Sequence, residues 1–148
     1  MADSSLVARA ARLASGLQIH AEAAALLTAS RLALRLLPFH VVEPALGQRA
    51  SDAIDSSEGG GTADRTCQRV LRAVARVRRV LPWDSTCLCA ALAAKSMLRL
   101  RGAPGLVLIG VKKRADSPLE AHAWIECTGA ASQERTNNAE FAAIAGYR

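Results

Sequence analysis

One cysteine and one histidine of this chain stand where they could act together in nucleophilic catalysis. Cys87 follows Asp84-Ser85-Thr86, a run of residues that commonly cap helices, so we expect it at the second or third position of a helix. Unpaired backbone N–H groups and the helix dipole favour a thiolate there, and the same groups could stabilise a tetrahedral oxyanion. His122 lies in a later strand-like segment, where its imidazole could hold the thiol proton and deliver it to a leaving amine.

Each of these residues also has a plainer interpretation. A cysteine at a helix start is more often a small buried hydrophobic residue, and a strand histidine flanked by Ala and Trp is more often structural. The other histidines, His20 and His40, have no supporting neighbours. Cys87 and His122 are therefore more informative as a pair than either is alone.

A third side chain should orient the imidazole from the strand beside it. If a hairpin turns at Thr128-Gly129, the position across from His122 falls near Glu134, with the amide of Gln133 next to it. We assign Glu134 as the third catalytic residue, and a solvated turn carboxylate is the alternative.

Two tryptophans are candidates for substrate binding. We assign Trp124 and Trp83 to this role, although an aromatic residue packed in the core is the more frequent case.

The remaining motifs predict no metal and no cofactor. Cys87-Leu88-Cys89 is too short and too isolated for a usual zinc site, and no phosphate-binding Gly loop or dinucleotide fingerprint is present. We expect Cys67, Cys89 and Cys127 to be core residues. Because the N-terminus carries no secretory signal, we expect all four cysteines to be reduced thiols of a cytoplasmic protein.

The elements that must position these residues follow from hydrophobic spacing and from breakers. Residues 4–37 predict one or two helices, with Gly16 as an optional break and Pro38 as the end. The apolar stretch 23–39 contains two arginines, which disfavours a membrane-spanning helix. Three regions result, within one compact domain overall: helices in 1–46, a flexible polar linker or loop in 47–64, and a core in 65–148.

Within the core, the pattern alternates between helix and strand. It predicts, in order, a helix from 65 to Pro82, a buried central helix from the Cys87 region to Arg101 closed by Gly102, strands over 105–112 and 120–127, a short third strand over 130–135, and a final helix from Asn137 or Asn138 through Ala145.

Positive charge is concentrated in the middle of the chain. Residues 65–114 contain twelve Lys or Arg against a single acid, Asp84, while the whole chain has a net charge of +6. Such a segment could bind nucleic acid, an acidic peptide or an acidic protein, or it could be a solvated helix face.

Residues 81–129 resemble the transglutaminase-like leader peptidases of lasso-peptide biosynthesis, the family of the B protein's C-terminal half. The arginine-rich helix before them and the leucine-rich N-terminus are also similar to this family. The resemblance rests on Leu81-Pro82-Trp83, Cys87-Leu88, Ala91-Leu92-Ala93, Leu98-Arg99-Leu100-Arg101-Gly102, 106–111, and Glu120-Ala121-His122-Ala123-Trp124-Ile125-Glu126.

The resemblance implies an α+β fold, with N-terminal helices and a papain/transglutaminase-like core in which a central helix packs on a small antiparallel sheet. It implies a bacterial cytoplasmic cysteine protease that removes the leader from a ribosomally made precursor peptide, with Cys87 as nucleophile and His122 as general base. The family's third residue is usually an Asp after the histidine, and no Asp follows Asp116 here.

The resemblance also implies partners. Residues 1–64 lack the strand alternation of a leader-recognition module, so a separate recognition protein should present the leader, and the lasso cyclase is a further candidate partner. We expect no nucleic acid partner. A non-catalytic peptide-binding module on the same fold and an acyl-transfer enzyme are the alternative functions.

Overall fold

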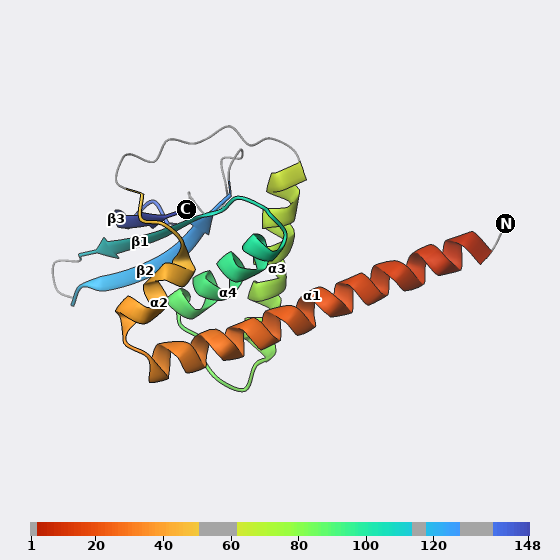
Figure 1. Cartoon of the computed structure of the whole chain (residues 1–148), viewed down its shortest axis with the longest axis horizontal. Helices are drawn as coiled ribbons and strands as arrows, with labels where there is room; N and C mark the ends of the chain where they lie inside the picture. Colours follow the sequence, from red (N-terminus) through yellow and green to blue (C-terminus); the bar gives the residue numbers. More distant parts are fainter. Residues whose placement is uncertain (1–2, 51–61, 114–117, 128–137) are drawn as a thin grey trace.

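Helices and a small sheet form separate layers in this α+β protein. The computed structural model describes residues 3–50, 62–113, 118–127 and 138–148. Their order along the chain, drawn in Figure 1, is α1 (Asp3–Leu36), α2 (Phe39–Leu46), α3 (Thr62–Val80), α4 (Cys87–Leu100), β1 (Leu106–Lys112), β2 (Glu120–Glu126) and β3 (Ala142–Tyr147). The predicted fold class is confirmed.

Helix α1 is one continuous helix that passes through Gly16 without a break. Its N-terminal part extends beyond the other elements in Figure 1, while from Ile19 onward it buries Ile19, Ala23 and Leu27 against the core. Pro38 ends the helix, as predicted, and N-caps the short α2. None of the helices in the described ranges has the length and apolarity needed to cross a membrane.

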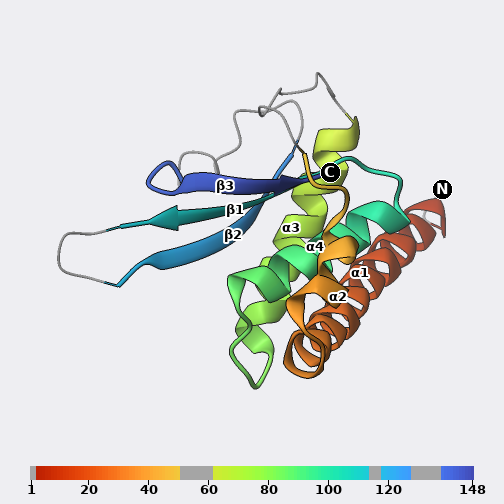
Figure 2. The same ribbon diagram turned by 60° about the vertical axis from the view of Figure 1, so that its left-hand side comes forward.

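Helix α4 is the central helix, as expected. It packs against α1, α3, α2 and β2, and it buries most of its side chains. Figure 2 shows the helices gathered on one side of the sheet, with α4 between α1 and the strands. Gly102 follows the helix with φ of 59°, a backbone conformation that glycine adopts without the penalty of a Cβ atom.

The sheet is antiparallel with the order β2-β1-β3, so β1 is its central strand. Strands β1 and β2 fall within one residue of the predicted bounds at each end, because their apolar runs are bounded by turn residues. Their register pairs His122 with Gly110. The predicted third strand over 130–135 lies outside the described residues.

The predicted final helix is wrong, because residues 142–147 form strand β3. The alanines of this segment favour a helix locally, but pairing with β1 and burial of Tyr147 determine its conformation. The Tyr147 hydroxyl donates to Glu43 Oε1 at 2.9 Å, which ties β3 to α2.

Both ends of the expected linker lie within the described part of the chain. Gln48 and Arg148 exchange backbone hydrogen bonds of 2.9 Å, and Ala50 N–H donates to Gly146 at 2.9 Å. At the other end, residues 62–64 are the first residues of α3. The chain therefore runs along the end of β3 before it reaches the segment 51–61, which lies outside the described residues.

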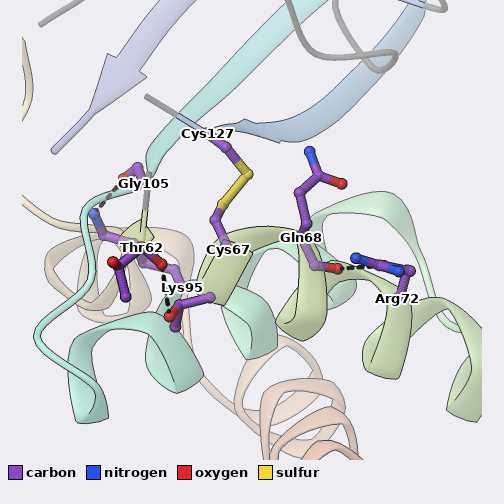
Figure 3. The surroundings of a disulfide bond; sticks show 8 residues. Thr62, Cys67, Gln68, Arg72, Lys95, Gly105 and Cys127 are labelled. Carbon is purple, nitrogen blue, oxygen red and sulfur yellow. Dashed lines mark hydrogen bonds between the residues drawn. A yellow bond between two sulfur atoms is a disulfide. The ribbon is translucent and has the colours of Figure 1, made fainter. Parts of the chain in front are cut away.

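The expected reduced state of Cys67 and Cys127 is also wrong. Both are buried core residues, as predicted, but a disulfide joins them across a sequence separation of 60 residues (Figure 3). Their Cα atoms lie 5.9 Å apart because α3 packs beside the end of β2, and this distance is typical of a bridged pair. The disulfide therefore links α3 covalently to the end of β2, the strand that carries His122.

A buried cation joins α4 to the sheet. Lys95 is 6% exposed, and its ammonium donates to the carbonyl oxygen of Gly105 at 2.7 Å, just before β1 (Figure 3). Burial lowers the pKa of Lys95, and the nearby Arg99 adds to this effect. The hydrogen bond satisfies part of a side chain that would otherwise be costly to bury.

Candidate active site

Cys87 is the first residue of α4, so it lies slightly earlier in the helix than predicted. Thr86 is the N-cap, and its hydroxyl accepts a hydrogen bond of 3.2 Å from the backbone N–H of Cys89. The half-buried Cys87 thiol therefore sits in the first turn, where backbone N–H groups lack helical partners. The nucleophilic role of Cys87 stays a prediction, made for a thiol in the first turn of a helix.

The second free thiol has different surroundings. Cys89 is buried, and its Sγ lies 3.3 Å from the carbonyl oxygen of Leu27. Burial raises the pKa of the Cys89 thiol, although the charges of Arg78 and Arg31 partly oppose this. Cys89 is thus a packing residue, as expected, and it provides a matched control for Cys87.

Two arginines hold the loop that precedes Cys87. Arg78 donates to Ser85 twice, from Nε to Oγ at 2.8 Å and from Nη2 to the carbonyl oxygen at 2.7 Å. Arg31 donates from Nη1 to the carbonyl oxygen of Asp84 at 2.5 Å, and its guanidinium lies over the Trp83 ring, 5.7 Å from the centroid. Helices α3 and α1 therefore both fix the path of the chain into α4.

The role of Arg78 was not predicted from the sequence, although its helical spacing is a signal for it. Arg78 recurs at helical spacing after Leu71 and Val74, so it lies on the cavity side of α3, while its side chain is exposed like those of the other arginines on this helix. From that side its guanidinium reaches the hydroxyl and the carbonyl oxygen of Ser85.

His122 lies on β2 in an aromatic cluster. Its ring stacks on Trp124 with centroids 5.9 Å apart, and the ring of Phe141 lies 5.1 Å away. Burial lowers the pKa of His122, the positive charge of Arg78 lowers it further, and Glu120 partly opposes both. This lowered pKa favours the neutral imidazole, which is the form that can accept a proton.

The absence of a side chain at Gly110 leaves space for this aromatic cluster. A Cβ atom at Gly110 would come within 2.8 Å of the Trp124 ring and 2.9 Å of the Ala142 carbonyl oxygen. Because Gly110 pairs with His122 across the two strands, its missing side chain lets the Trp124 ring lie against β1 beside the histidine.

Cys87 and His122 line one cavity of about 250 Å³. Helices α3 and α4 contribute a mostly apolar wall, and β2 contributes the opposite one. The lining residues are Leu71, Val74, Ala75, Arg78, Cys87, Ala90, Ala91, Ala94, His122, Ala123, Trp124, Ile125 and Asn138. The structure thus brings together the predicted pair and the predicted substrate-binding Trp124.

The other predicted site residues are placed differently. Trp83 lies in the loop before α4, under Arg31, and is not among the residues that line the cavity. Glu134 lies outside the described residues. Asn138 does line the cavity, whereas its sequence context predicted only a helix cap. Its amide is a candidate partner for the imidazole that no local pattern could have revealed.

Trp124 carries a buried donor that has no partner in the described part of the chain. Its indole Nε1–H makes no hydrogen bond to any of the described residues, and Trp124 is 8% exposed. A buried donor left unpaired costs about 1–3 kcal/mol, so a carbonyl oxygen of a ligand that reached this N–H would gain more than it would in water. Trp124 therefore remains a substrate-binding candidate.

Comparison with known proteins identifies the family. No curated protein and no solved structure matches the chain. A comparison with protein families matches residues 24–146 to the transglutaminase-like superfamily. This match includes Cys87, His122, Asn138 and every element except the first part of α1 and the last residue of β3. The chain therefore belongs to the transglutaminase-like superfamily.

Proposed function

We propose that this protein is a cysteine endopeptidase that removes the leader from a ribosomally made lasso-peptide precursor. The observation that supports this best is the shared cavity, which is lined by a thiol at a helix N-terminus and by an imidazole. Membership of the transglutaminase-like superfamily supports the thiol chemistry. The resemblance of residues 81–129 to leader peptidases supports the choice of substrate.

In the first half of the reaction, the imidazole of His122 accepts the proton of the Cys87 thiol. The thiolate attacks the scissile carbonyl carbon, and the carbonyl π electrons move to oxygen. The first-turn N–H groups of α4 stabilise the resulting oxyanion. When the oxyanion collapses, the C–N bond breaks, His122 gives its proton to the leaving amine, and a thioester to Cys87 remains.

In the second half, water replaces the amine. His122 takes a proton from water, and the oxygen attacks the thioester carbonyl. Collapse of the second tetrahedral intermediate expels the Cys87 thiolate, which regains its proton from His122. The leader leaves as a carboxylic acid, and the core peptide carries a new amino terminus. No metal or cofactor takes part in these steps.

A third residue should hold the imidazole in a productive orientation. Glu134 is the carboxylate that the sequence proposes for this role. Asn138 is a second candidate, because its amide lines the cavity with His122. An amide can accept from an imidazole N–H as a carboxylate does, without adding charge.

A separate recognition protein would supply the leader. The described N-terminal part of the chain is helical. It therefore does not provide the strands of a leader-recognition module within residues 3–50. The precursor would accordingly arrive bound to a second protein, and the cyclase would act on the released core.

Mass spectrometry of cleavage products tests the proposal. The purified full chain is incubated with a candidate precursor peptide, with and without the leader-recognition protein. We expect cleavage at one bond that depends on this partner. Cys87→Ala and His122→Ala should each lower the rate at least 100-fold, while the matched control Cys89→Ala retains it.

Two outcomes would redirect the assignment. A folded wild-type protein that binds the partner and leader but never cuts would favour the binding-module alternative. A product that carries an added amine in place of water, seen as a mass shift when a competing amine is supplied, would favour acyl transfer.

A further inference from the structure

Helix α3 has three faces with different environments. One face is buried in the core through Cys67, Val70 and Val77, and a second lines the cavity through Leu71 and Arg78. The third face is exposed and basic. It consists of the arginine row, Arg65, Arg72, Arg76 and Arg79, which share one side of the helix at spacings of three, four and seven residues.

No acidic side chain within the described residues pairs with the arginine row. The ion pairs in these parts of the chain, Arg101–Glu22 and Lys112–Glu140, lie on other elements. Within the described ranges, the row donates one hydrogen bond, from Arg72 Nε to the carbonyl oxygen of Gln68 at 3.2 Å, within α3 itself. Arg69, on the side facing α1, is excluded from the row because its Nη2 lies 3.4 Å from Ser15 Oγ.

The arginine row borders the cavity. Arg72, Arg76 and Arg79 each follow directly in sequence a cavity-lining residue, namely Leu71, Ala75 and Arg78. A step of one residue is a turn of about 100° around the helix axis, so the row lies next to the cavity wall and faces solvent. A peptide that leaves the cavity over α3 would therefore cross these guanidinium groups.

The row has a length suited to a short peptide segment. From Arg72 to Arg79 it spans about 10 Å, and from Arg65 to Arg79 about 21 Å, at 1.5 Å per helical residue. An extended peptide rises about 3.3 Å per residue, so about six of its residues would cover the row. Acidic residues at every second position of such a peptide would each find an arginine within reach.

We propose that the arginine row binds acidic side chains of the peptide substrate next to the scissile bond. This inference rests on the proposed function, because it assigns a charge preference to the substrate of the same cavity. An acidic peptide is favoured over nucleic acid because α3 contains no aromatic residue on which bases could stack. Guanidinium groups bind carboxylates with paired N–H donors, which suits this role.

A binding measurement with Cys87→Ala protein separates this inference from catalysis. A fluorescein-labelled peptide with Glu at alternate positions is titrated by fluorescence anisotropy, beside the same peptide with Gln in place of Glu. We expect the Glu peptide to bind at least tenfold more tightly than the Gln peptide, and added salt to reduce this difference.

A matched pair of variants locates the binding surface. Arg72→Glu/Arg79→Glu should weaken binding of the Glu peptide about tenfold, because two attractive pairs become repulsive. Arg99→Glu/Lys113→Glu makes the same change in net charge at two exposed residues that neither belong to α3 nor line the cavity, and it should change binding less than twofold. Equal thermal melting temperatures would show that both variants remain folded.

Three results would overturn the proposal: equal binding of the Glu and Gln peptides, equal effects of the two double variants, or tighter binding of a single-stranded oligonucleotide than of the Glu peptide. The wild-type protein could bind the Glu peptide through the arginine row and yet cleave no peptide. That result would support the proposed binding role of the row and would contradict the proposed protease activity. The two proposals therefore fail separately.

Discussion

Arg78 donates hydrogen bonds to both the hydroxyl and the carbonyl oxygen of Ser85, which lies two residues before the candidate nucleophile. The same guanidinium lines the cavity and acts electrostatically on His122. One side chain of α3 thus connects the position of Cys87 with the protonation of His122. Both halves of the proposed catalytic pair depend on it.

Replacing Arg78 by Gln should impair cleavage in a pH-dependent way. We expect kcat/KM at neutral pH to fall about tenfold or more, because the loop before Cys87 loses two hydrogen bonds. Removing the positive charge should also raise the pKa of His122, so the acid limb of the pH–rate profile should move to higher pH. Arg99→Gln, on an exposed residue of α4, serves as control, and an unmoved acid limb would contradict the electrostatic role.

Asn138 and Glu134 can be compared as positioning residues. If Asn138 orients the imidazole, Asn138→Ala should lower kcat about tenfold with little change in KM, while Glu134→Gln should have a small effect. The pH–rate profile of Asn138→Asp provides a second readout, because an added carboxylate would raise the pKa of His122. A larger loss of kcat in Glu134→Gln than in Asn138→Ala would assign the positioning of the imidazole to Glu134.

Trp124→Phe tests the unpaired indole N–H. The phenyl ring retains most of the aromatic packing on His122 and Phe141, and the variant loses a buried donor that has no partner among the described residues. We therefore expect the free energy of unfolding to change by less than about 1.5 kcal/mol. If a peptide carbonyl accepts from this N–H, KM should rise severalfold. Isothermal denaturation and steady-state kinetics measure the two effects, and an unchanged KM would limit Trp124 to packing.

Glu22→Gln should destabilise the junction between α1 and α4. Arg101 donates to both carboxylate oxygens of Glu22, at 2.7 and 2.6 Å, but both side chains are partly exposed. The loss should therefore be about 1 kcal/mol or less at pH 7. The hydrogen bond from Arg101 lowers the pKa of Glu22 below its ordinary value of 4.5.

The pH dependence of this pair has a definite sign. Because the folded-state pKa is the lower one, the stabilisation is fully present above pH 4.5 and disappears as pH falls through the folded-state pKa. Urea denaturation of wild type and Glu22→Gln should thus converge in acid. A difference that persists well below pH 4.5 would show that the lost stability is not electrostatic.

The disulfide should contribute strongly to stability. Cys67→Ser/Cys127→Ser opens a loop of about 60 residues, for which loop-closure entropy corresponds to about 4 kcal/mol. Denaturant unfolding of the double variant, with Cys89→Ala as control, measures this loss. Alkylation of the unfolded protein without reductant should label Cys87 and Cys89 only. Labelling of all four cysteines would disprove the bridge.

Local patterns predicted the parts of this fold that depend on neighbouring residues. Strands β1 and β2 were recognisable from apolar runs between turn residues, and the start of α4 from the capping residues before Cys87. Strand β3 could not be recognised in this way, because its alanines favour a helix and only pairing with β1 makes them a strand. Secondary structure that depends on a distant partner is not encoded in the local composition.

The candidate site divides in the same way. Cys87 and His122 could be chosen because each carries chemistry and a telling local context. Asn138 and the Cys67–Cys127 bridge could not, because they depend on how β2, α3 and the C-terminal part of the chain meet in space. Arg78 lies between these cases, since helical phase marks its side of α3 but not its partner Ser85.

The Cys67–Cys127 disulfide has a practical consequence for the proposed enzyme. Catalysis requires Cys87 as a free thiol, whereas the scaffold around it requires two other sulfur atoms to stay oxidised. A dithiol that rescues an oxidised Cys87 will, at higher concentration, open the bridge between α3 and β2. Activity plotted against reductant should therefore rise and then fall, and this optimum defines a redox window in which the protein can work.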